Sequence, residues 1–137
     1  MQGRPLTEVK EAFEASGLGR REWKAEGGER LPDVTDRARD YITDTTDIYM
    51  PAQSNAKDLS ETPVRGLLVT HQVFIKEFLN VIHEINEEPY DDRHRAKNTA
   101  LYIVRFARDI FGNLTAEILV NNDDTHNQVP LSEVCNN

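Results

Sequence analysis

The sequence predicts an α/β fold, a sandwich in which helices cover a sheet. Two amphipathic helical patterns come first, and a short unbroken apolar run then leads directly into a third helical pattern. Two more strand-like runs follow, joined by a turn that contains glycine. One parallel β-α unit followed by antiparallel edge strands is typical of such a sandwich. The 137 residues suit one domain with a moderate core.

The first two helices are predicted from apolar spacing and end signals. Residues 5–16 have apolar side chains on one face, and Gly17 suits the helix end. Residues 18–30 form a charged, glycine-containing connection, and residues 31–50 then show a longer helical pattern. Residues 51–63 are polar and bounded by prolines, which predicts a surface loop.

A strand followed at once by a helix forms the third unit. Residues 66–70, Gly-Leu-Leu-Val-Thr, are apolar without alternation, which is typical of a strand buried on both faces of a parallel sheet. Residues 73–85 then have helical spacing, and residues 86–97 read as a loop. His71 lies between the strand and the helix, so an imidazole is expected at this junction.

A β-hairpin is predicted towards the C-terminus. Residues 99–107 and 115–120 read as its strands, and Gly112 in the turn between them can adopt a positive φ without strain. The chain after Asn121 is polar, and we expect it to be loose.

Composition restricts the partners and the compartment. The formal net charge of −8 disfavours nucleic acid, because binding a duplex requires Lys and Arg to neutralise phosphates. The single cysteine excludes an intrachain disulfide, which favours a reducing compartment, and we expect a cytoplasmic protein. No apolar run approaches the ~20 residues of a membrane span, so no membrane partner is expected. The sequence predicts no metal site and no cofactor.

His71 is the first candidate functional residue. Ligands of open α/β sheets collect at the carboxyl ends of strands, and a helix N-terminus offers free N–H groups and a partial positive charge to a phosphate. An imidazole placed there can donate a hydrogen bond to an anion or transfer a proton. The alternative is a histidine that caps the helix or packs at an ordinary turn, and the spacing leaves both interpretations open.

Two further stretches contain candidate binding residues. Gly28 and the glycine before it allow a close approach of the backbone, and Glu29 lies near the start of a helix, where a carboxylate is electrostatically favoured. A plain loop and helix cap is the alternative there. Asn98 and Thr99 precede a predicted strand, from which their side chains could reach a pocket.

Other polar clusters are interpreted as solvated. The Arg-His-Arg run at 93–95 belongs to a highly charged loop, and His83 is placed on the polar side of its helix. A metal ion could be contacted by Asp123, Asp124 and His126, but a solvated tail is the simpler interpretation.

Together, these stretches resemble the C-terminal part of the histidine phosphatase superfamily, which has the phosphoglycerate mutase-like fold. Gly-Gly-Glu at 27–29 resembles the family's Gly-Gly-Glu-Ser segment, and Thr-His at 70–71 resembles its second histidine motif. Asn-Thr at 98–99 resembles the start of a family strand, and residues 120–127, VNNDDTHN, resemble its closing segment. The order of the four segments agrees with the family's order.

The resemblance covers residues 1–127, a partial histidine phosphatase domain, and leaves residues 128–137 as a polar C-terminal tail. It implies a three-layer sandwich that is truncated, with the first strand and its motif missing. The segments Met-Gln-Gly-Arg-Pro-Leu at the start and Gly-Gly-Glu-Arg-Leu look closest to TIGAR-type fructose-2,6-bisphosphatases. The implied function is a phosphatase that acts on a sugar bisphosphate through a phosphohistidine.

In that family, a histidine in an Arg-His-Gly motif accepts the phosphoryl group, a second histidine and two arginines bind its oxygens, and a glutamate is the general acid. By resemblance, His71 is the second histidine, and the Gln72 N–H donates to the same oxygens. The other residues that the resemblance assigns to substrate binding are Gly28, Glu29, Asn98 and Thr99.

The chain also departs from the family pattern. It contains no Arg-His-Gly, Met1 aligns just after the general-acid glutamate, and Gln72 and Arg30 stand where the family has Gly and Ser. We therefore expect little or no phosphatase activity from this chain alone. The alternative is a non-catalytic phosphate-binding or regulatory module derived from the same fold. Without the first strand, the apolar edge at 66–70 would be exposed, and we expect self-association through it.

Overall fold

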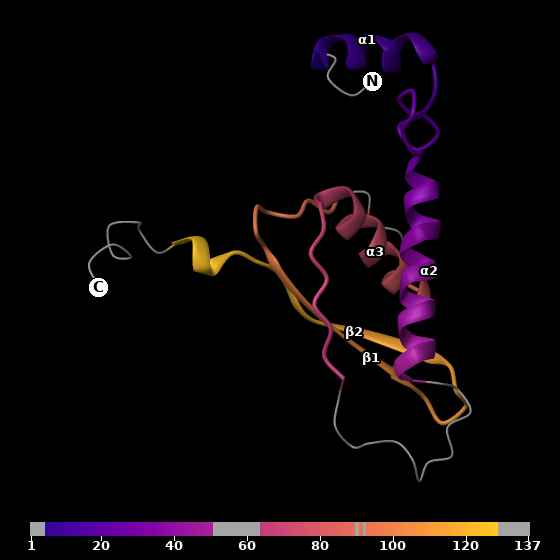
Figure 1. The fold of residues 1–137 in the computed structure, drawn as a ribbon, viewed down its shortest axis with the longest axis vertical. Helices are drawn as coiled ribbons and strands as arrows, with labels where there is room; N and C mark the ends of the chain where they lie inside the picture. The colour runs from indigo at the N-terminus through magenta and orange to yellow at the C-terminus, as the bar shows by residue number, and fades with distance from the viewer. Residues whose placement is uncertain (1–4, 51–63, 90, 92, 129–137) are drawn as a thin grey trace.

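The computed structural model of the chain describes residues 5–50, 64–89, 91 and 93–128. Its elements, in order, are α1 (Leu6–Ser16), α2 (Leu31–Tyr49), α3 (Gln72–Ile85), β1 (Leu101–Arg108), β2 (Leu114–Asp123) and the 3-10 helix η1 (Thr125–Gln128). The two strands form one antiparallel hairpin, α3 packs against it, and α2 packs against α3 (Figure 1). The predicted α/β class is confirmed, and the three helices agree with their predicted positions to within one residue at each end.

Helix α2 forms because apolar residues recur at every fourth position, at Val34, Ala38 and Ile42, and the buried stripe continues to Thr46. At its start, the Asp33 carboxylate accepts the Arg30 N–H at 2.9 Å, and hydrogen bonds from Arg30 lower the pKa of Asp33 to about 2. At its end, the Arg108 guanidinium of β1 donates to the Met50 carbonyl and to the Asp47 carboxylate, both at 2.7 Å. The same guanidinium also donates to a carbonyl of the hairpin turn at 3.0 Å. Arg108 thereby joins the helix end to the sheet.

The predicted hairpin is confirmed, but β1 begins two residues later than expected, and β2 extends beyond the predicted strand at both ends. Gly112 has a φ of 85°, and the Asp109 carboxylate accepts the N–H groups of Phe111 and Asn113 at 2.8 Å each, which closes the turn. Along both strands, partly buried residues that face the helices alternate with exposed ones. One face of the hairpin therefore packs on α2 and α3, and the other face is exposed.

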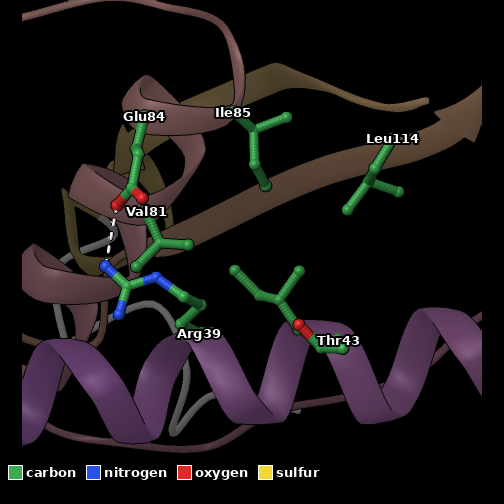
Figure 2. A pocket seen from close by; sticks show the side chains of 7 residues that line it. Arg39, Thr43, Val81, Glu84, Ile85 and Leu114 are labelled. Carbon is green, nitrogen blue, oxygen red and sulfur yellow. Dashed lines mark hydrogen bonds and ion pairs between the residues drawn. The ribbon is translucent and has the colours of Figure 1, made fainter.

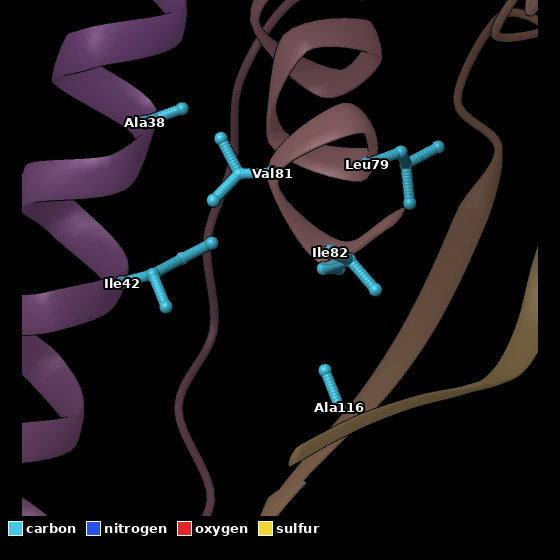
Figure 3. Close-up of a cluster of buried hydrophobic side chains, with 6 residues drawn as sticks. All are labelled: Ala38, Ile42, Leu79, Val81, Ile82 and Ala116. Atoms are coloured by element: carbon cyan, nitrogen blue, oxygen red, sulfur yellow. The ribbon is translucent and has the colours of Figure 1, made fainter. Parts of the chain in front are cut away.

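The core lies where α2, α3 and the hairpin meet. Figure 3 shows Val81 of α3 directed towards Ala38 and Ile42 of α2, and Ile82 directed towards Ala116 of β2. Ile82 and Ala38 have no exposed surface. Because α3 lies between α2 and the hairpin, its apolar residues pack against both.

The predicted strand at 66–70 is wrong. Residues 64–71 are extended but belong to no sheet, and Leu67 and Val69 are 87% and 86% exposed rather than buried on both faces. A strand requires a neighbour for its backbone N–H and C=O groups, and among the described residues β1 pairs only with β2. The predicted parallel β-α unit is therefore absent from the described part of the chain, as is the sheet edge expected at 66–70.

The prediction for the C-terminal region is partly wrong. The chain after Asn121 is not loose at first, because β2 continues to Asp123 and η1 follows. The tail expected at 128–137 lies outside the described residues apart from residue 128, as does the loop expected at 51–63. No helix in the described ranges has the length and apolar character needed to span a membrane.

Candidate functional site

His71 occupies the N-cap position of α3, directly before its first residue. Its carbonyl accepts the N–H of Ile75 at 3.0 Å, which starts the helix, but its side chain makes no capping hydrogen bond. The residue is exposed. His71 therefore caps α3 through its backbone only, and its side chain neither makes a capping hydrogen bond nor is buried at the turn.

The start of α3 is suited to an anion. Gln72 is the first helical residue and is exposed, and the first N–H groups of a helix have no partner within it. The helix has 14 residues and no acidic side chain in its first turn. Its N-terminal partial positive charge is therefore not cancelled locally.

The Gly-Gly-Glu segment lies in a turn before α2. The Gly28 N–H donates to the Ala25 carbonyl at 2.8 Å, and a Cβ on Gly28 would lie 3.1 Å from that same oxygen. Glu29 forms an ion pair of 2.9 Å with Arg37 of α2. The close approach that Gly28 allows is thus used within the turn, and the Glu29 carboxylate is paired with a side chain of α2.

Arg37 is a residue that the sequence reasoning missed. Its guanidinium carbon lies 5.5 Å from the ring centroid of Phe74, which is three residues after His71 on α3. The chain of contacts Glu29–Arg37–Phe74 therefore connects the Gly-Gly-Glu segment to the first turn of α3. The spacing of residues along α2 contains no signal for this contact.

Asn98 and Thr99 lie in the turn before β1 and not at the start of the strand. The Asn98 carbonyl accepts the Asn127 side-chain amide at 3.0 Å, and the Thr99 hydroxyl accepts the same amide at 2.8 Å. The Thr99 hydroxyl also lies 3.1 Å from Nε2 of His126. Two of the stretches singled out in the sequence, 98–99 and 120–127, therefore meet here.

The candidate residues thus form two groups. His71, Gln72, Gly28 and Glu29 belong to the starts of α2 and α3, and Asn98 and Thr99 lie beside Asn127. In Figure 1, the starts of α2 and α3 and the approach to β1 all lie towards the upper end of the view. Within the described part of the chain, however, no hydrogen bond or ion pair links His71 with Glu29, Asn98 or Thr99.

Two clefts lie away from these groups. Figure 2 shows the first, of about 200 Å³, between α2, α3 and the start of β2, with the Arg39–Glu84 ion pair of 2.8 Å at its rim. Ile42, Val81 and Leu114 give it apolar walls. The second, of about 350 Å³, is lined by residues with polar side chains, Arg21, Thr35, Asn80, Glu84 and Glu88. Neither cleft is lined by His71, Gln72, Gly28, Glu29, Asn98 or Thr99.

A buried carboxylate lies beside the polar cleft. Glu77 of α3 has no exposed surface, and its carboxylate accepts the Thr35 hydroxyl of α2 at 2.7 Å and the Arg21 guanidinium at 3.4 Å. These contacts fix the 18–30 connection and both helices relative to one another. The sequence did contain a signal, because Glu77 lies between Phe74 and Val81 on the apolar stripe of α3, where a carboxylate requires partners.

The interpretation of residues 93–95 as solvated is wrong for His94. The residue is half-buried, its Nε2 lies 3.0 Å from the Tyr102 hydroxyl, and burial lowers the pKa of His94. The Tyr102 hydroxyl donates in turn to the Asn122 side-chain oxygen at 2.8 Å, and burial raises the pKa of Tyr102. Asn122 also accepts the Lys97 N–H at 2.8 Å, so this network fastens the 94–97 loop to β2.

His83 is partly buried and pairs with Glu88.

No group of three or more His, Cys, Asp or Glu side chains within the described ranges is arranged to hold a metal ion. Asp124, one of the residues considered for such a site, instead forms an ion pair of 2.8 Å with Lys97. The Thr125 N–H and hydroxyl hydrogen-bond to Asp123 and lower the pKa of that carboxyl.

Comparison with known proteins gave one match. The sequence model of the histidine phosphatase superfamily (branch 1) matches residues 1–116, which is most of the chain. The matched range includes His71, Gln72 and the two predicted binding stretches but not the 120–127 segment. No match was found among curated proteins or among solved structures.

Proposed function

Because this chain belongs to the histidine phosphatase superfamily (branch 1), we propose that it binds the phosphoryl group of a sugar phosphate at His71 and the start of α3. Membership of the superfamily supports phosphatase chemistry, a hydrolase activity, at a coarse level. The three helices and the two-stranded antiparallel sheet are consistent with a truncated form of that fold.

The observation that carries the proposal is the free imidazole at the N-cap of α3. His71 is exposed and makes no capping hydrogen bond, so its ring is available to a ligand. The N–H groups of Gln72, Val73 and Phe74 precede the first intrahelical bond, which the Ile75 N–H donates. A phosphate at this position would accept from the imidazole and from these N–H groups together.

The net charge of the chain explains why anion binding must depend on groups close to His71. The chain carries a net charge of −8, so its overall field repels an anion. The positive end of α3 counters that field close to His71, whereas the nearby Arg37 guanidinium is already paired with Glu29. We therefore propose weak binding that falls as salt rises, since screening acts on exposed sites first.

The substrate proposed within this class is a sugar bisphosphate of the fructose-2,6-bisphosphate type. Its support is the likeness of the N-terminal and Gly-Gly-Glu segments to TIGAR-type enzymes. Gly28, Glu29, Asn98 and Thr99 are the proposed contacts to the rest of the sugar phosphate. A cytoplasmic location is part of the same proposal and is supported by the single cysteine.

We further propose that these 137 residues alone do not turn the substrate over. They contain no Arg-His-Gly motif, and the loss of a nucleophile costs on the order of 10⁶ in rate in a serine protease. Phosphate release from fructose 2,6-bisphosphate should therefore remain at background. Turnover within tenfold of an intact phosphatase of the superfamily would contradict this.

Calorimetric titration with inorganic phosphate tests the binding proposal. His71→Ala should weaken binding about tenfold or more, because it removes one hydrogen bond to a charged group. His83→Ala is the matched control, since it removes an imidazole from the last turn of the same helix and should leave phosphate affinity unchanged. Equal affinity in the wild-type chain and the His71→Ala variant would overturn the proposed site.

A further inference from the structure

The hairpin has a second face that α2 and α3 do not cover. The side chains on this outer face are Leu101, Ile103, Arg105 and Ala107 of β1 and Thr115, Glu117, Leu119 and Asn121 of β2. Leu101, Ile103 and Leu119 are 48%, 43% and 48% exposed. Water-facing positions of an antiparallel sheet are normally polar, so three large aliphatic side chains there indicate a contact surface.

Charge on the outer face is balanced. Arg105 and Glu117 are directly opposite in the strand register, and the Arg105 Nε donates to the Glu117 carboxylate at 3.1 Å. Ile103 and Leu119 occupy the next exposed positions along the two strands, on the side away from the turn. β1 therefore presents one charge and two large aliphatic groups, β2 presents one charge and one large aliphatic group, and the two charges have opposite signs.

We propose that the outer face is an interface between two copies of the chain, related by a two-fold axis that runs parallel to the strands. This operator places β1 of each copy over β2 of the other, at the spacing of about 10 Å that is usual for stacked sheets. Arg105 then faces the partner's Glu117, and Ile103 faces the partner's Leu119. A two-fold axis perpendicular to the strands that passes through the Arg105–Glu117 pair would instead place Arg105 against the partner's Arg105, which like charges disfavour.

A second copy fits this face because the face is complementary to itself. An isologous contact satisfies both charges and covers the aliphatic groups of both copies at once. The net charge of −8 opposes association elsewhere, where no such pairing offsets the repulsion. A standard interface has about 20–30 residues on each side. Eight side chains per copy form a smaller contact, so the dimer should depend on concentration.

This surface differs from the edge at 66–70 through which self-association was expected. That edge is not formed, because residues 64–71 are not part of a sheet. The two surfaces can be separated by mutation, since Leu68 lies in the extended segment and Leu119 lies on the outer face.

Sedimentation equilibrium of the full chain and of two charge-reversal variants tests the proposal. Arg105→Glu gives a face with two carboxylates, and Glu117→Arg gives a face with two guanidinium groups. Each change should weaken the dimer by at least about tenfold, because each dimer contains the contact twice. An equimolar mixture of the two variants should regain the wild-type dissociation constant as a mixed dimer.

The mixture of the two variants distinguishes contacts between copies from contacts within one chain. Both variants lose the Arg105–Glu117 pair within the chain, and mixing cannot repair it, so recovered association reports only on contacts between copies. Leu119→Lys should abolish the dimer, and Leu68→Lys should leave it unchanged, with circular dichroism confirming that each variant is folded. A wild-type chain that stays monomeric up to about 1 mM, a mixture that does not associate, or a dimer lost only in Leu68→Lys would overturn the interface.

Discussion

Replacing the buried carboxylate of Glu77 should destabilise the fold far more than replacing an exposed carboxylate on the same helix. Glu77 has no exposed side-chain surface, whereas the side chain of Glu84 is 60% exposed. Both carboxylates pair with an arginine from another part of the chain, Arg21 and Arg39 respectively. Glu77→Gln and Glu84→Gln are therefore matched changes that differ mainly in burial.

The magnitude follows from the contacts. The Thr35 hydroxyl donates to Glu77 at 2.7 Å, and a hydrogen bond to a charged group contributes about 1.5–3 kcal/mol. The Arg21 contact is long, at 3.4 Å, and that side chain is 34% exposed, so it adds less. The new amide also places an NH₂ group in a site without solvent. We expect Glu77→Gln to cost about 2–3 kcal/mol, and Glu84→Gln about 0.2–1 kcal/mol.

Urea unfolding followed by circular dichroism at neutral pH measures both values. Equal m-values for the wild-type chain and the two variants would show that the midpoints report stability alone. If Glu77→Gln cost no more than Glu84→Gln, the assignment of Glu77 as the buried connection between the 18–30 segment, α2 and α3 would be wrong.

Two other predictions concern the sheet. Arg108→Lys should lower the free energy of unfolding in urea by about 1–2 kcal/mol, because one ammonium group cannot reproduce the three directed hydrogen bonds of the guanidinium. The exposed Arg105→Lys is the control. A cost of Arg108→Lys no larger than that of Arg105→Lys would contradict the prediction. Burial lowers the pKa of His94, so its contribution to stability is present above about pH 6.5 and is lost as the pH falls through the lower folded pKa. An NMR titration of the His94 ring should give a pKa below 6.5, and a value at or above 6.5 would refute the account of its contact with Tyr102.

Local signals in the sequence predicted the helices and the hairpin because their causes are local. The apolar stripe from Val34 to Ile42 determines α2, and Gly112 allows the turn that joins β1 to β2. The run at 66–70 misled the prediction because an apolar segment becomes a strand only when another segment pairs with it. Pairing is a non-local property, and the composition of the run does not encode it.

The candidate site was predictable to a similar degree. The position of His71 followed from the boundary between an apolar run and a helical pattern, and the structure places it at the N-cap of α3 as expected. The contacts of Arg37 with Glu29 and Phe74 depend on how α2 packs beside α3. Thr99 meets Asn127 only because the hairpin brings the two ends of its strands together. Contacts of this kind require the fold before they can be recognised.

Binding of a phosphoryl anion at the start of α3 is the proposal on which the function of this chain depends. Amide NMR spectra recorded during a titration with inorganic phosphate test it directly. The largest shifts should fall on the N–H groups of Gln72, Val73 and Phe74 and on the His71 ring, and the amide shifts should shrink in His71→Ala. Phosphate that shifts none of these groups, or that shifts them equally in His71→Ala, would contradict the claim.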